Sequence, residues 1–408
     1  AGPARFGVFL VNQSLSARAA PPIWMLALAV SGANVGMSLL SPAVPDLRAD
    51  LLATADEAQL VLSGFLVMLG LGQLGAGSVS DSLGRRPVMM FGALLFAVSG
   101  IGALLAPNVW LLILMRVLQG IGAAACMAMG RVIVNDSFSR DEAGRQLSTI
   151  TMFQAVVPIL GFAFGGMLAD FVGWRGAVAV MVATAAVVLL ATIFLLRETR
   201  LEKSSPMPVG RMIGVYVQLL GTPKFISNAG AAALLTAAFF AMGGFMPYHF
   251  KSLGASAFEF GLYFSITSVG YMAGNSINRS LGPRMGLDRA AFTGSLISVV
   301  AMSGLTVAGY TENAVQPVVA GFLFFYGLSN GLVIANTIIG AVRAAGPHSG
   351  AATGLCGALQ MGVSAVLGSL IIAFGGDSNF KLAISICWLM SAFGVASAYL
   401  ALERAPRR

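Results

Sequence analysis

Long apolar runs, separated by short polar turns, occupy almost the whole chain. A helix that crosses a lipid bilayer needs ~20 mostly apolar residues. Because the runs are continuously apolar rather than alternating, they predict helices and not the strands of a barrel. We therefore expect an all-α membrane protein with 12 transmembrane helices. The predicted spans are at about 22–42, 57–77, 88–106, 109–133, 146–169, 176–197, 223–248, 258–279, 289–308, 316–340, 350–373 and 379–402.

The composition excludes a soluble protein. Of the 408 residues, 57% are hydrophobic and 10% are charged, whereas soluble domains carry about 25% charged residues. Cys126, Cys356 and Cys387 lie inside apolar runs, which predicts small core residues rather than disulfides or metal ligands. The sequence has no phosphate-binding glycine loop, metal-ligand cluster or nucleophile–base pair. We therefore predict no enzyme, no cofactor and no metal site, so that transport would draw on an ion or substrate gradient.

The positive charges are distributed unevenly among the loops. The formal net charge is +8, and Lys and Arg concentrate in alternate loops, which in membrane proteins are the cytoplasmic ones. The loops assigned to the opposite side hold only Arg48, Arg175, Lys251 and Lys381. An even number of spans then puts both basic termini in the cytoplasm. The pattern predicts a multi-pass protein of the cell's inner membrane, in contact with lipid and not with nucleic acid.

The longest polar gap, from Glu198 to Pro223, divides the predicted spans into two equal sets. We interpret it as a linker between two bundles and expect the chain to act as a monomer. The predicted organisation is a cytoplasmic N-terminal segment (1–21), a first six-helix bundle (22–197), a cytoplasmic linker (198–222), a second six-helix bundle (223–402) and a cytoplasmic tail (403–408).

The turn between the second and third spans carries a distinctive set of residues. Gly77 would let two helices approach closely, and Gly84 would permit a sharp turn. Asp81 would accept hydrogen bonds at a helix end, while Arg85 and Arg86 would be held on one side of the membrane. Such a turn could latch two rigid bodies together and release them when they rock.

This turn resembles the signature loop of the major facilitator superfamily, which usually reads Asp-Arg-x-Gly-Arg-Arg/Lys. Ser82 stands where arginine is commonest, and the resulting pattern resembles the bicyclomycin-resistance type of drug–proton antiporters. The resemblance implies two six-helix bundles that rock around one central cavity. The loop between the eighth and ninth spans repeats part of the pattern, as expected of a transporter with two related halves, in Gly274, Asn278, Arg279, Gly282 and Arg284.

Arg116 is a charged residue within the fourth span. An ionised side chain in lipid costs ~3 kcal/mol or more, so it should face the bundle interior or a wet cavity; alternatively, it could snorkel to the headgroups. With Gln119, Gly120 and Gly122 it forms Arg-x-x-Gln-Gly-x-Gly. This resembles a motif of proton-driven exporters, in which the arginine is linked to proton coupling.

The fifth span contains small residues at helical spacing. Pro158, Gly161, Gly165 and Gly166 resemble the antiporter motif Gly-Pro-x-x-Gly-Gly, with Phe162 in place of its proline. Proline frees a carbonyl and bends a helix, while glycines allow close helix contact. We expect a flexible, closely packed face here.

No carboxylate lies in the middle of any predicted span. In the antiporter branch that the turn resembles, the first span usually carries an aspartate where this chain has Ser38. Two explanations remain open. A carboxylate near the outer mouth, Asp46 or Asp170, titrates instead, or Arg116 faces an anionic substrate directly. His249 is a further group that could titrate.

Polar and aromatic side chains within the spans are the predicted lining of a substrate cavity. They are Asn34, Ser38, Arg116, Gln119, Gln154, Phe240, Tyr271, Asn330, Asn336 and Gln360. The predicted coupling and gating residues are Asp46, Gly77, Asp81, Gly84, Arg85, Arg86, Arg116, Pro158, Gly161 and Gly165.

Three functions are compatible with this pattern. The first is proton-coupled efflux of small amphipathic drugs or metabolites by alternating access. The second is transport of a specific organic anion with Arg116 as its counter-ion. The third is a non-transporting membrane receptor or scaffold, which the intact turn before the third span disfavours.

Overall fold

The computed structural model describes residues 20–200 and 208–402. The predicted N-terminal segment up to residue 19, part of the linker and the tail from 403 onward lie outside the described residues. Within the described ranges the chain is helical and contains no strand. The predicted helical fold class is therefore confirmed.

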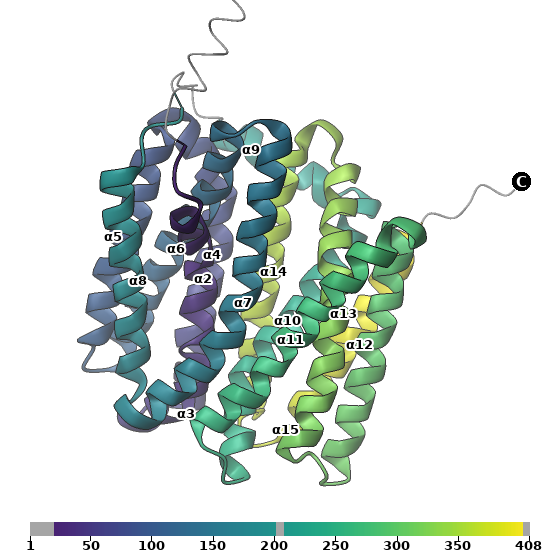
Figure 1. Cartoon of the computed structure of the whole chain (residues 1–408). Coiled ribbons are helices and arrows are strands. Elements are labelled where there is room, and N and C mark those ends of the chain that lie inside the picture. Colours follow the sequence, from purple (N-terminus) through teal and green to yellow (C-terminus); the bar gives the residue numbers. More distant parts are fainter. Residues whose placement is uncertain (1–19, 201–207, 403–408) are drawn as a thin grey trace, which may run out of the picture.

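The first bundle contains the helices α2 to α8 (Figure 1). The first span is broken into two α-helices with a 3-10 turn between them, where Pro42 and Pro45 interrupt regular hydrogen bonding. The elements are α2 (Ile23–Ser38), η1 (Ser41–Ala43), α3 (Val44–Asp50), α4 (Ala55–Leu83), α5 (Arg85–Leu104), α6 (Val109–Ser137), α7 (Arg140–Val172) and α8 (Trp174–Leu195).

The second bundle contains the helices α10 to α15, and a short helix, α9, precedes it in the linker (Figure 1). The elements are α9 (Val209–Leu220), α10 (Pro223–Ser252), α11 (Ala257–Met285), α12 (Leu287–Tyr310), α13 (Gln316–Ala344), η2 (Gly346–His348), α14 (Ser349–Ala373) and α15 (Phe380–Ala401).

Eleven helices in the described part of the chain are long and apolar enough to cross a membrane. The remaining span of the twelve predicted, 258–279, falls within α11, which has 29 residues but is less apolar. Ser265, Thr267 and Ser268 are buried along it, and the helix packs against α7 and α13. Its polar residues therefore face protein rather than lipid.

Glycines with positive φ angles separate successive helices at the linker side. Gly84 (φ +109°) ends α4 and begins α5, as the sequence predicts. In the second bundle α11 continues to Met285 and turns at Gly286 (φ +80°). The prediction that Gly274, Asn278, Arg279, Gly282 and Arg284 lie in the loop between the eighth and ninth spans is wrong, because all five lie inside α11.

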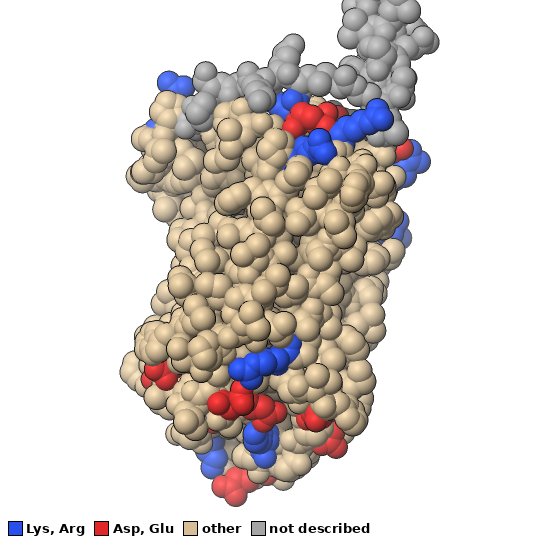
Figure 2. Space-filling model, turned by 90° about the vertical axis from the view of Figure 1, so that its left-hand side faces the viewer, with Lys and Arg blue, Asp and Glu red and all other residues tan. Residues whose placement is uncertain are grey.

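The two bundles meet along two helix pairs. Helix α7 packs beside α11, and α4 packs beside α14 (Figure 1). We call the end of the molecule with α9 and the Gly84 turn the linker end, and the opposite end the Asp46 end. Figure 2 shows charged side chains gathered toward both ends of one face, with a broad uncharged band between them. Such a band is expected of a surface in contact with lipid.

Candidate functional site

Polar contacts between the bundles close the Asp46 end. Lys251 Nζ lies 2.7 Å from Asp46 Oδ1, and Arg48 Nη1 lies 3.0 Å from Asp377 Oδ2. The Asp170 carboxylate of α7 accepts hydrogen bonds from the first two backbone amides of α11, at 3.1 and 2.9 Å. A carboxylate at a helix N-terminus is stabilised by the free amides and the helix dipole. Asp170 therefore caps a helix of the opposite bundle.

A pocket lies between the bundles beside these contacts. Its lining includes Asp46 and Asp170 from the first bundle and Lys251 from the second. Both carboxylates that the sequence offers as titrating groups therefore line one polar pocket at the bundle interface.

Glycines allow the helices at this end to approach closely. A Cβ at Gly166 would collide with the backbone carbonyl of Ala257 in the opposite bundle, and one at Gly165 with the carbonyl of Leu39. Gly161 packs directly on Ser38, whose hydroxyl donates to the Asn34 carbonyl at 2.7 Å. The closely packed face expected on α7, which contains Pro158, is therefore present, and Ser38 lies within the packing between α2 and α7.

Aromatic side chains form a second layer, further from the Asp46 end. Phe162 of α7 contacts Phe239 and Phe264 of the second bundle, with ring centroids 6.2 and 4.7 Å apart. Phe239 in turn contacts Phe240, which packs against the core of the first bundle. We call Phe162, Phe239, Phe240 and Phe264 the aromatic seal. The phenylalanine that replaces the motif's proline is the residue that the first bundle contributes to it.

A polar cluster forms a third layer, nearer the linker end. Arg131 of α6 is half-buried, and its Nη2 lies 3.4 Å from Gln154 Oε1. Asn34 Nδ2 donates to the Gln154 carbonyl at 3.1 Å. Tyr271 belongs to α11, which packs beside α7 across the bundle interface, and it has an electrostatic effect on Arg131. We call Asn34, Arg131, Gln154 and Tyr271 the Arg131 cluster.

Sequence reasoning identified three of these four residues but missed the arginine, because the predicted span 109–133 puts Arg131 near its cytoplasmic end, where basic residues are common. The signal was present, since Arg131 lies within the apolar run from Ile121 to Val134. It is six residues, or ~9 Å, from the end of α6 at Ser137.

Arg116 lies elsewhere, fully buried inside the first bundle with 0% exposure. Its Nη2 donates to the Gly36 carbonyl and its Nη1 to Gln119 Oε1, both at 2.9 Å. Its Nε donates to the Val61 carbonyl at 3.3 Å, and its guanidinium lies 4.2 Å from the Phe65 ring centroid. Because its side chain is fully buried in this conformation, a substrate could reach it only after the helices separated.

The remaining predicted polar residues lie inside the second bundle. Asn336 Nδ2 donates to Asn278 Oδ1 at 2.8 Å, and Gln360 Oε1 accepts from Thr236 at 3.2 Å. Asn330 is buried, and its Oδ1 has no partner in the described part of the chain. They do not join the Arg131 cluster in this conformation.

The signature turn at the linker end is held within the first bundle. Arg85 lies 2.8 Å from Asp81 and 2.9 Å from Asp136. Glu198 accepts from the backbone amides of Arg85 and Arg86, at 2.8 and 3.2 Å, and so caps α5. In this conformation these contacts do not join the two bundles. At Gly77 a Cβ would meet nothing within 4 Å, so the expected close approach is not made in this conformation.

Contacts between α4 and the second half of the chain occur near this turn instead. Tyr216 of α9 donates to the Leu74 carbonyl at 2.9 Å, and Gly354 of α14 faces the Gln73 backbone.

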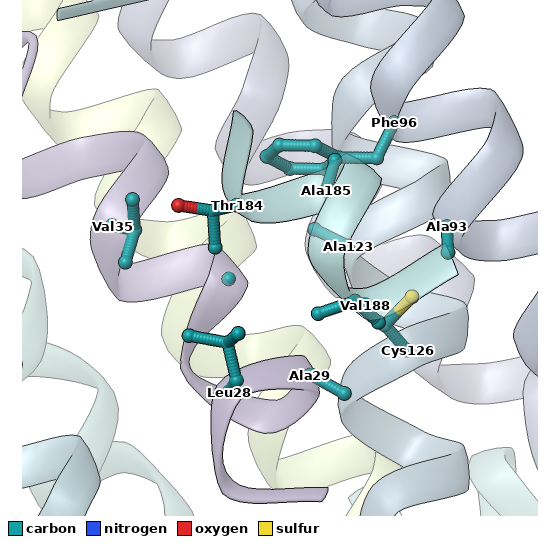
Figure 3. Close-up of a pocket in the computed structure, with 11 residues that line it drawn as sticks. Leu28, Ala29, Val35, Ala93, Phe96, Ala123, Cys126, Thr184, Ala185 and Val188 are labelled. Carbon is teal, nitrogen blue, oxygen red and sulfur yellow. The ribbon is translucent and has the colours of Figure 1, made fainter. Parts of the chain in front are cut away.

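An apolar pocket also lies within the first bundle, among α2, α5, α6 and α8 (Figure 3). Its polar side chain, Thr184, donates to the Val180 carbonyl at 2.8 Å. Because all lining residues belong to one bundle, this pocket is not on a path between the two.

Comparisons with known proteins agree with this architecture. The family model described as Major Facilitator Superfamily matches residues 26–369. An uncharacterized MFS-type transporter of Bacillus subtilis, YdgK, is 28% identical over 346 residues, which are 83% of this chain and 84% of that protein. A bicyclomycin resistance protein homolog of Haemophilus influenzae is 22% identical over 351 residues, 84% of this chain and 86% of the other.

Solved structures show the same fold. A D-xylose–proton symporter superposes with a TM-score of 0.75 over 94% of this chain and 98% of its own, at 16% identity. A nucleoside transporter gives a TM-score of 0.73 over 93% and 99%, at 12% identity. At such identities the likeness establishes the arrangement of the helices and says nothing about the substrate.

Proposed function

Because the chain belongs to the major facilitator superfamily and is a secondary transporter rather than an enzyme, we propose that it exports small amphipathic compounds in exchange for protons. The similarity to a bicyclomycin resistance protein homolog supports this proposal. A chloramphenicol resistance protein of Pseudomonas aeruginosa is also 37% identical over 144 residues, 35% of this chain and 34% of that protein.

In this proposal the protein lies in the inner membrane as a monomer, with the linker end and both termini in the cytoplasm. The positive charge of the linker-end loops supports this orientation. The conformation described above would then be closed toward the outside. Rocking of the bundles would break the Asp46-end contacts and separate the residues of the aromatic seal, which would open the protein toward the outside.

The observation that carries the proposal is the type of contact at the Asp46 end. Exposed ion pairs are worth ~0–1 kcal/mol each. They therefore stabilise the closed arrangement of the bundles only weakly and can break when the bundles rock. Asp170 binds two amides of the opposite bundle as a carboxylate, and protonation removes the charge that those amides stabilise. We assign the coupling proton to the Asp46–Asp170 pocket, which Lys251 of the second bundle also lines.

Transport by the purified protein tests this function. Proteoliposomes with an acidic interior would be given ethidium, chloramphenicol or 2-naphthoate, which represent a cation, a neutral compound and an anion. Accumulation of at least one compound that stops when a protonophore collapses the gradient is the expected result. If none accumulates above the level in protein-free liposomes, proton-coupled export is wrong.

The alternative, transport of a specific organic anion, also has support from a particular observation. No carboxylate of the described residues lies within 4 Å of Arg116 or Arg131. Arg116, however, is enclosed by protein oxygens. Of the two arginines, Arg131 is the better placed to meet a ligand.

A further inference from the structure

We propose that the Arg131 cluster binds an anionic group, a carboxylate, of the transported compound. This inference rests on the proposed transport function and narrows its substrate class to amphipathic compounds that carry such a group. It begins from a comparison of three arginines in the first bundle, Arg85, Arg116 and Arg131.

Two of these arginines are already satisfied by the protein. Arg85 has the carboxylates of Asp81 and Asp136. Arg116 donates to three oxygens and lies over an aromatic ring. Both are therefore components of the fold.

Arg131 differs from both. A guanidinium carries five N–H donors and keeps its charge at any physiological pH. Among the described residues, the Arg131 side chain makes one long hydrogen bond, to Gln154 at 3.4 Å. A charge within a membrane span is costly and marks a functional site when it is not paired. Arg131 therefore has both the need for a counter-ion and the donors to bind one.

Arg131 lies beside the interface between the bundles, where a transported substrate would bind. Helices α7 and α11 run side by side and together pass through three layers. Asp170 faces the first turn of α11, Phe162 faces Phe264, and Gln154 lies beside Arg131, on which Tyr271 of α11 has an electrostatic effect. The aromatic seal and the Asp46-end contacts thus lie between the cluster and one end of the molecule, so a ligand would reach the cluster from the linker end.

The surrounding side chains define the ligand. The planar fork of a guanidinium matches a carboxylate bidentately. The Tyr271 hydroxyl and the Gln154 and Asn34 amides can add hydrogen bonds to the same group. The neighbouring aromatic seal supplies an apolar surface for the rest of the molecule. A lipophilic cation would be repelled by Arg131, so the cluster selects against it.

A matched pair of probes separates charge from shape. The full-length protein in lipid nanodiscs would be titrated with 2-naphthoate and with its uncharged methyl ester. We expect Arg131→Gln to weaken naphthoate binding at least tenfold and to leave binding of the ester within twofold. Arg131→Lys should weaken naphthoate binding by an intermediate factor, because lysine keeps the charge but loses the fork.

Arg145→Gln is the control, since this arginine is exposed on α7 and its replacement removes the same charge outside the cluster. It should leave naphthoate binding unchanged. Equal affinity of wild-type protein and Arg131→Gln for naphthoate would overturn the proposal, as would wild-type protein that binds the ester as tightly as the acid. If Arg131→Gln does not fold, Arg131→Lys with unaltered naphthoate affinity overturns it as well.

The inference and the proposed function fail differently. Proton-driven accumulation of ethidium or chloramphenicol without any of naphthoate would leave export intact and remove the anion site. Binding of naphthoate that depends on Arg131, without proton-driven accumulation of any compound, would support the anion site and contradict proton-coupled export.

Discussion

At the scale of single residues, the two span arginines of α6 have different roles although the sequence gives both an apolar setting. Arg116 is enclosed by the carbonyls of Gly36 and Val61 and by Gln119, so it ties α2 and α4 to α6. Sequence reasoning could not find these partners, because two of them are backbone oxygens that every residue possesses. It predicted the depth of Arg116 correctly but not what the guanidinium binds.

Replacing Arg116 with alanine should therefore reduce stability rather than ligand affinity. The change removes the donors that Arg116 supplies to the buried Gly36 carbonyl and to Gln119 Oε1. It also empties the space of a large side chain, and together these losses should cost about 2–4 kcal/mol. Thermal unfolding in nanodiscs, with Arg145→Gln as the control, measures the loss. A variant with wild-type stability that no longer binds 2-naphthoate would instead restore Arg116 as the substrate's counter-ion.

Asp170 is the single residue whose change should open the Asp46 end. In Asp170→Asn one amide oxygen replaces a carboxylate that accepts two backbone hydrogen bonds, and the favourable charge at the α11 N-terminus is lost. We expect this to cost the closed state about 1 kcal/mol, a roughly fivefold shift in population.

Spin labels can measure this shift. Asp56→Cys and Asn313→Cys introduce labels on exposed positions of opposite bundles near this end, while the native cysteines are buried. The distance distribution should gain a longer component in Asp170→Asn, and wild-type protein should gain the same component when acid protonates the carboxylate. An unchanged distribution under both conditions would remove Asp170 from the gate.

At the scale of elements, the pair formed by α7 and α11 positions all three layers of the interface. The sequence indicated the small residues of α7, because glycines at helical spacing favour close packing. It did not reveal that Gly166 faces the Ala257 backbone of the opposite bundle. Hydrophobic periodicity gives the length of a helix and its depth, but a helix that is apolar nearly all round does not show which side meets which neighbour.

Gly166→Val should consequently prevent closure at the Asp46 end without unfolding either bundle. The added side chain would overlap the carbonyl of Ala257, and backbone atoms cannot move aside as a flexible side chain can. The same spin labels should report mostly the longer distance. Gly321→Ala, at a glycine with nothing within 4 Å of its Cβ position, is the control and should keep the wild-type distribution.

At the scale of the whole molecule, the arrangement of spans follows from the sequence, and the site does not. Lipid requires apolar length, so the runs from residue 57 onward predict the transmembrane helices with ends that differ by up to six residues, whereas the break in the first span and the short helix α9 were not predicted. Helix α11 is less apolar than the other spans because its buried serines and threonine face protein, where contact with lipid does not require an apolar side chain. The Arg131 cluster combines α2, α6 and α7 with α11 of the other bundle. It forms only when each helix is rotated about its axis so that these side chains meet, and no local sequence pattern shows that rotation.

If the bundles rock, fixing them together at the Asp46 end must stop transport while leaving the Arg131 cluster reachable from the linker end. Arg48 and Asp377 lie on opposite bundles, 3.0 Å apart at their charged atoms. The double variant Arg48→Cys, Asp377→Cys would be joined by a short bismaleimide after its transport is measured. We expect transport to fall to the level of protein-free liposomes in proportion to the fraction cross-linked, and naphthoate affinity to stay within twofold.

Each single cysteine variant, treated with the same reagent, controls for modification alone. Continued transport by fully cross-linked protein would mean that this end does not open during the cycle, because a covalent link of that length cannot accommodate the separation that passage of a substrate requires.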